Sequence, residues 1–179
     1  MKKIQNSKFK IQNFNQAGFT LIELILYIVL VTIMLSTLIP FAWNVIEGGV
    51  KVTVEQEVYS QARYLSERIK KEIRDASTAT CTSATVLTLT NSVAAKSPTT
   101  ITLASNAVSI TQGTQIPSSV RLHSNDTLVS ASGNFCTTYT GTNTDNVQIS
   151  FTIADNYSGT TRQEYNESLN VQFSAETRN

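Results

Sequence analysis

The most prominent pattern in the chain is an uninterrupted apolar run from Leu24 to Trp43, twenty residues without a charge. At about 1.5 Å per residue, a helix of that length matches the roughly 30 Å hydrocarbon core of a bilayer. The run is apolar on every side and lies behind a basic segment, which favours a membrane helix over a buried core helix. We therefore predict a membrane-spanning helix over residues 19–43.

A second pattern follows, in which apolar residues recur at steps of three and four, as on one face of an α-helix. The stripe consists of Val50, Val54, Val58, Ala62, Leu65, Ile69, Ile73 and Ala76. It predicts an amphipathic helix over residues 44–76, which ends near Ala76 because Ser77 and Thr78 begin a stretch of poor helix formers. A continuous helix from Phe19 to Ala76 has 58 residues and a length of about 87 Å.

Residues 77–179 show the alternation of β-strands. Apolar and polar residues alternate over 147–153 and again over 169–175, which predicts an antiparallel hairpin with a long loop. Shorter candidate strands are 85–90, 99–104, 107–111, 120–122 and 128–131, with turn signals at 105–107, 132–134 and 141–143. The predicted fold class is α+β, with a long N-terminal helix packed on a C-terminal antiparallel β-rich head.

The charges are nearly balanced, with 14 Lys and Arg against 13 Asp and Glu. Residues 1–18 carry four Lys and no acid, a charge of +4, whereas the whole chain has a net charge of only +1. The positive-inside rule then places the N-terminus in the cytoplasm and the head outside. Because the remainder of the chain is acidic, nucleic acid is not an expected partner.

The residues that most often carry chemistry are scarce. The chain has one His and two Cys, so a His/Cys zinc site would need carboxylates to complete it. His123, Asp126 and nearby Ser residues could be arranged as a catalytic set, but only residue type supports it. We therefore expect no enzyme activity and no catalytic, cofactor or metal site.

Cys81 follows the predicted helix, and Cys136 lies 55 positions later. An even number of cysteines in an exported domain favours a disulfide, which would join the helix exit to the sheet. Two buried free thiols are the alternative.

The segment AGFTLIELILYIVL at residues 17–30 closely resembles the type IV prepilin signal. The resemblance implies that prepilin peptidase removes residues 1–18 as a leader by cutting between Gly18 and Phe19. It also implies methylation of the new Phe19 amine and retention of the helix in the mature protein.

Two residues, one just before the apolar run and one inside it, acquire roles from this resemblance. An acid costs about 2.5–3.5 kcal/mol at the bilayer centre and less near the end of the helix, where Glu23 could reach the interface. In pilins, the acid at this position sets the axial register of a subunit that joins the filament. Pro40 lies where pilins often carry a proline, and its ring should kink or loosen the helix.

A weaker resemblance covers YLSERIKKEIRDAS at 64–77, followed by TVLTLTN. This stretch is similar to the W-type minor pilins and the J-type pseudopilins, which form or prime filament tips. The cysteine spacing departs from that of major pilins, whose disulfide usually lies near the C-terminus. The resemblance thus implies a minor subunit of a type IV pilus-like filament, in pilus, type II secretion or DNA-uptake machinery.

The implied partners are other pilin-like subunits, prepilin peptidase, an inner-membrane assembly platform and the membrane itself. The implied location is the cytoplasmic membrane, with a single pass, and then an extracellular or periplasmic filament. Two other possibilities remain: a major pilin of the shaft, and a signal-anchored surface domain or adhesin that does not polymerise.

Overall fold

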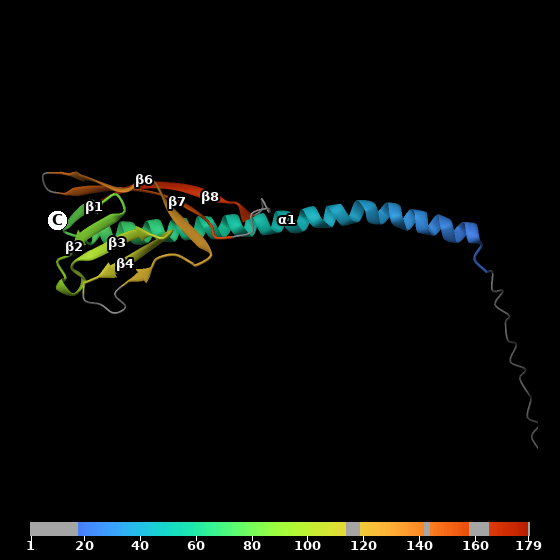
Figure 1. Ribbon diagram of the computed structural model, residues 1–179, viewed down its shortest axis with the longest axis horizontal. Helices are drawn as coiled ribbons and strands as arrows, with labels where there is room; N and C mark the ends of the chain where they lie inside the picture. Colours follow the sequence, from blue (N-terminus) through green and yellow to red (C-terminus); the bar gives the residue numbers. More distant parts are fainter. Residues whose placement is uncertain (1–17, 114–118, 142–143, 158–164, 179) are drawn as a thin grey trace, which may run out of the picture. The chain divides into compact units, whose positions relative to one another are not determined.

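A computed structural model describes residues 18–113, 119–141, 144–157 and 165–178. The chain divides into two units, residues 1–44 and 45–179, and each is described by itself. The α+β class predicted from the sequence is confirmed, since one long N-terminal helix precedes antiparallel sheets (Figure 1).

The helix, α1, runs from Leu21 to Arg74 over 54 residues. It begins two residues after Phe19 and ends two residues before Ala76, a difference within the usual uncertainty of helix ends. By length and composition, α1 is apolar enough to cross a membrane. In the second unit, the predicted stripe is buried from Val54 onward, whereas Val50 is only partly buried.

The first sheet is antiparallel, with the strands in the order β1-β2-β3-β4-β5. Its strands are β1 (Thr78–Ser83), β2 (Val86–Thr90), β3 (Thr99–Ala104), β4 (Ala107–Gln112) and β5 (Val120–Arg121), and a short 3-10 helix, η1 (Ala94–Lys96), precedes β3. Ser105 and Asn106 form the β3–β4 turn with φ of 51° and 58°. This left-handed pair confirms the turn expected at 105–107. The sequence does not predict the strand β1, because Ala79 and Cys81 alternate there with Thr but no large apolar side chain marks the inward face.

The second sheet has the order β6-β7-β8, with β6 (Thr127–Thr140), β7 (Asp145–Asp155) and β8 (Ser168–Glu176). The strands β7 and β8 pair antiparallel in one register, which confirms the predicted hairpin.

The turn expected at 132–134 is wrong, because β6 continues through these residues with a register shift between Ala131 and Cys136. Gly133 lies inside this irregularity at φ 85°, so the glycine permits a bulge rather than a reversal. The turn expected at 141–143 falls partly outside the described residues, although Gly141 N–H donates to the Thr144 carbonyl at 3.0 Å.

One hydrophobic core fills the second unit. It combines the α1 stripe with the inward faces of both sheets, and its largest fully buried side chains include Phe135, Phe151, Leu65 and Ile69. Because strands of both sheets contribute to the same core as α1, the predicted packing of the outer helix on the head is present in this unit.

Candidate functional site

The start of α1 is fixed by Thr20. Its hydroxyl oxygen accepts the Glu23 N–H at 3.3 Å, and its carbonyl accepts the Leu24 N–H at 3.2 Å. Thr20 is therefore the N-cap, with an acid three residues later, the spacing of a capping box. Glu23 lies in the first turn, where the positive end of the helix dipole stabilises a carboxylate. The sequence TLIE contains this signal, which our sequence analysis missed.

Phe19, Glu23 and Tyr27 are spaced four residues apart, on one side of the helix start. The rings of Phe19 and Tyr27 meet edge to face, with centroids 6.5 Å apart. Phe19 is 76% exposed. Within the described residues, the Glu23 carboxylate has neither a hydrogen bond nor an ion pair with its own chain.

The apolar side chains of the first unit are uncovered. The large apolar residues from Phe19 to Trp43 are all exposed, including Leu30 and Leu35 near the middle. A contiguous apolar surface of this extent requires lipid or other helices around it. The chain itself therefore presents this surface for contact with something outside its own fold.

Pro40 lies inside α1, which continues through it without interruption. Proline removes the N–H that would bond to the Ser36 carbonyl. In the preceding turn, the hydroxyls of Ser36 and Thr37 donate to the carbonyls of Ile33 and Met34, at 2.8 and 2.9 Å. A local loss of helicity at Pro40 remains a prediction.

The two cysteines lie on different sheets. Cys81 in β1 and Cys136 in β6 form a disulfide, with their Cα atoms 6.0 Å apart. The Cys81 N–H also donates to the Thr138 hydroxyl at 2.8 Å. The bond thus joins the two sheets close to the point where the chain leaves α1.

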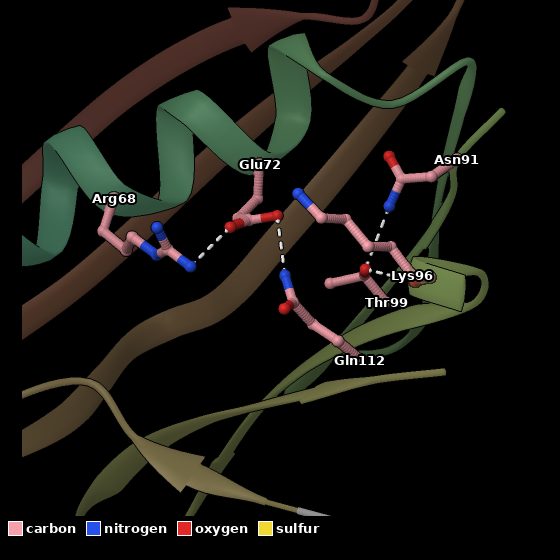
Figure 2. Close-up of polar contacts among 6 residues, drawn as sticks. All are labelled: Arg68, Glu72, Asn91, Lys96, Thr99 and Gln112. Carbon is pink, nitrogen blue, oxygen red and sulfur yellow. Dashed lines mark hydrogen bonds and ion pairs between the residues drawn. The ribbon is translucent and has the colours of Figure 1, made fainter. Parts of the chain in front are cut away.

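A buried carboxylate connects α1 to the first sheet. Glu72 is 4% exposed; one oxygen accepts the Arg68 guanidinium at 2.8 Å and the other accepts the Gln112 side-chain amide at 3.1 Å (Figure 2). Gln112 ends β4, so the carboxylate ties the last turn of α1 to that strand. The many charged residues between 51 and 75 favour a solvent-exposed position for Glu72, but the structure buries its carboxylate between Arg68 and Gln112.

A second polar set lies beside Glu72. The Asn91 amide donates to the Thr99 hydroxyl at 2.9 Å, and this hydroxyl donates to the Lys96 carbonyl at 2.7 Å (Figure 2). This chain of donors fixes the orientation of the Asn91 amide. Among the described residues, the Asn91 side-chain oxygen is the one buried side-chain polar atom that has no hydrogen-bond partner. It borders a shallow hollow of about 380 Å³ whose charged lining includes both acids and bases.

His123 is 7% exposed. Its Nε2 accepts the Val108 N–H at 3.2 Å, so the hydrogen of the neutral ring is on Nδ1, 3.0 Å from both the Ser124 carbonyl and the Thr127 hydroxyl. Burial, followed by the positive charge of Arg121, lowers the pKa of His123 below its ordinary value.

Asp126 does not join His123, because its carboxylate accepts the Ser124 hydroxyl at 3.0 Å instead. The residues that could have formed a catalytic set are thus bonded to the backbone and to each other. Among the described residues, no group of three or more His, Cys, Asp or Glu side chains is arranged to hold a metal ion.

Comparison with known proteins adds one finding. Residues 13–39 match the family described as the prokaryotic N-terminal methylation motif. The chain carries the type IV prepilin signal. A search of the curated proteins found no match, and a search of the solved structures found none either.

The prepilin signal has consequences for the whole chain. It supports a type IV pilin-like protein, and it points to a structural role rather than an enzymatic one. It implies processing by prepilin peptidase and assembly with other pilins. Together with the exposed apolar helix, it indicates membrane anchoring.

Proposed function

We propose that the chain is a minor pilin or pseudopilin, a structural subunit of a type IV pilus-like filament with a tip or assembly-priming role. The observation that carries the proposal is the exposed apolar surface of α1 directly behind the prepilin signal. In the membrane, lipid covers this surface, and in a filament the helices of other subunits replace the lipid. The machinery served is a pilus, a secretion system or a DNA-uptake system.

Processing is the first step of this function. Prepilin peptidase removes residues 1–18, and the amine of Phe19 is then methylated. The mature chain retains α1 and its head. Intact-mass measurement of protein extracted from membranes should give residues 19–179 plus one methyl group. A chain that keeps residues 1–18, or that is cut beyond Trp43, would contradict this step.

Glu23 sets the axial register of the subunit. Its carboxylate has no bond to its own chain among the described residues, and cleavage would create a free amine at Phe19. The amine of a neighbouring subunit is the complementary charge, and their attraction is strong where water is excluded. Thr20 caps the helix, so the cap and the register function reside in different residues.

Two variants separate the cap from the register. Glu23→Gln keeps the size and the helix but removes the charge, so it should enter the membrane normally and be depleted from sheared filaments. Thr20→Val removes only the capping oxygen and should be incorporated normally. If both variants are incorporated like the wild type, the register role of Glu23 is wrong.

A minor role rests on the sequence of the helix end, 64–77, and on the position of the disulfide between β1 and β6. Subunits at a tip are needed in few copies, whereas a shaft subunit is repeated along the whole filament. Quantitative mass spectrometry of sheared filaments distinguishes the two. A chain that dominates the filament is a major pilin, and one that stays with the membrane fraction is a surface domain that does not polymerise.

A further inference from the structure

The two sheets of the head expose four edge strands within the described residues, namely β1, β5, β6 and β8. An open edge presents unpaired N–H and C=O groups to which another strand can bond. The edge of β1 is partly capped by side chains of the other sheet. The Ala79 N–H donates to the Asp145 carboxylate at 3.0 Å and the Cys81 N–H to the Thr138 hydroxyl at 2.8 Å.

The edges of β6 and β5 are also blunted. On β6, the N–H groups of Val129 and Phe135 donate to the carbonyls of Asn106 and Ala84, at 2.9 and 2.8 Å. The strand is further interrupted by the bulge at Gly133. The other edge strand of the first sheet, β5, has only two residues.

The remaining edge, β8, has nine residues and none of these protections. At the ends of its ladder, Asp155 N–H donates to the Glu167 carbonyl and Thr177 N–H donates to the Asp145 carbonyl. Bonded and non-bonded pairs alternate in antiparallel sheets. Odd-numbered residues of β8 therefore bond to β7, and even-numbered residues direct their N–H and C=O groups away from it. These residues are Ser168, Asn170, Gln172, Ser174 and Glu176.

The sequence of β8 does not discourage pairing either. From Ser168 to Ala175 it contains no charge and no proline, the features that usually block strand addition. No backbone partner for its outward groups lies among the described residues.

The side chains of β8 show the same lack of a neighbour. On β7, the four apolar residues from Val147 to Ile153 are completely buried. On β8, Leu169, Val171 and Phe173 pack on the same core but are only partly buried. The apolar layer of the sheet therefore ends half-covered at β8, and one more strand would complete it.

The helix surface near this edge defines the charge of the partner. The Lys70 ammonium lies 5.1 Å from the centre of the Phe173 ring. Arg63, Glu67 and Arg74 share a helix face with Lys70, since they are spaced at three and four residues. Glu67 bonds to Lys70 at 3.1 Å, so this face has an excess of positive charge. It favours a strand with apolar and acidic side chains on the side that faces α1.

We propose that β8 binds an extended segment of a neighbouring pilin-like subunit, which adds as a fourth strand to the second sheet. Backbone bonds to the even-numbered residues would supply affinity, and the half-buried apolar row with its basic border would select the side chains. This inference rests on the proposed function, because the filament supplies the neighbouring subunit.

The test uses the full chain in cells that assemble the filament, with a photo-crosslinking residue placed at Gln172. The same residue at exposed Val93, in the first sheet's connection, measures background. A third position, Ile33 in the apolar part of α1, reports contact with other subunits through the helix. We expect adducts from Gln172 to a pilin-like subunit, at least tenfold above Val93, with the linked site in an extended segment.

Backbone pairing is tested by Ser174→Pro, which removes an outward N–H but no bond to β7. It should lower the Gln172 adducts at least tenfold, whereas Ser174→Thr should leave them within twofold. If thermal unfolding shows that the proline variant is misfolded, Ser174→Lys serves instead, because a charge on the edge also opposes strand addition.

The outcomes are distinguishable. Adducts at the background level, or adducts insensitive to both Ser174→Pro and Ser174→Lys, overturn the strand proposal, as do adducts to lipid or to a second copy of this chain alone. Normal Ile33 adducts alongside these results leave the filament role intact. If the residue at Ile33 forms no adducts to any pilin-like subunit, the proposed function itself is overturned.

Discussion

Removal of the Glu72 carboxylate is expected to destabilise the head substantially. In Glu72→Ala, Gln112 loses its acceptor, Arg68 loses its ion pair, and a buried side chain leaves a gap. Hydrogen bonds to charged groups contribute about 1.5–3 kcal/mol each when buried. The Arg68 side chain is 34% exposed, so water can replace much of its bond. We therefore expect a loss of about 2–4 kcal/mol, below the sum of two fully buried bonds.

Two further variants divide this loss between the partners. Glu72→Gln keeps the volume and an acceptor for Gln112 but loses the charge, so it should cost about 1–2 kcal/mol. Arg68→Ala removes the partly exposed partner of the ion pair and should lower the free energy of unfolding by about 1 kcal/mol or less. The order of the three costs, rather than any single value, tests the geometry.

The measurement is urea unfolding of the full chain in a mild detergent, followed by near-ultraviolet circular dichroism. The single tryptophan, Trp43, belongs to the first unit, so the tyrosine signal reports mainly on the head. If Arg68→Ala costs as much as Glu72→Ala, the ion pair dominates and the assignment of the larger share to burial and Gln112 is wrong. A cost below 0.5 kcal/mol for Glu72→Ala, roughly the scatter of surface substitutions, would contradict burial of the carboxylate.

Three other predictions concern the head. Replacement of Cys81 and Cys136 by serine opens a loop of 55 residues and should cost up to about 4 kcal/mol on the chain-entropy argument; unchanged urea unfolding would contradict it. Burial lowers the pKa of His123 in the folded state, so the neutral ring contributes fully to folding stability above its ordinary pKa of 6.5. This stability is lost as the pH falls through the lower, folded pKa; the stability of a His123→Gln variant should not fall in this way at acidic pH. Gly113→Ala should cost more than Gly133→Ala in thermal unfolding, since both have positive φ but a Cβ at Gly113 collides with the Ala95 carbonyl oxygen; equal costs would show that this collision is relieved.

The elements predicted best are those whose apolar period continues over many residues. The stripe along α1 and the alternation in β7 and β8 each repeat over several turns or residue pairs, so no single residue decides the assignment. The strand β3 was placed at 99–104, where the structure has it. By contrast, β6 was predicted as a short strand at 128–131 because Ser132, Gly133 and Asn134 resemble a turn. The register shift in its pairing with β7 absorbs these residues, and local composition does not reveal it.

The cysteine pair illustrates another limit. Spacing and an even count favoured a disulfide, but the two sheets that it joins could not be known before the topology. Cys81 was expected at the helix exit, whereas it lies within β1, a strand that was not predicted. Because β1 was not predicted, the bonds from its edge to Asp145 and Thr138 could not be predicted either.

The two acids Glu23 and Glu72 show most clearly what a sequence pattern reveals. Glu23 is conspicuous because every neighbour from Leu24 to Trp43 is uncharged, and a charge that opposes its surroundings indicates a specific role. Glu72 stands in a segment rich in Lys, Arg and Glu, where local composition predicts solvent exposure. Among the described residues, the Glu23 carboxylate has no partner within its own chain, whereas Glu72 is buried with two partners. Composition measures how unusual a residue is among its sequence neighbours, whereas burial depends on strands such as β4 that lie forty residues away. A conspicuous acid therefore points to an interaction beyond the chain, and an inconspicuous one can still hold the fold together.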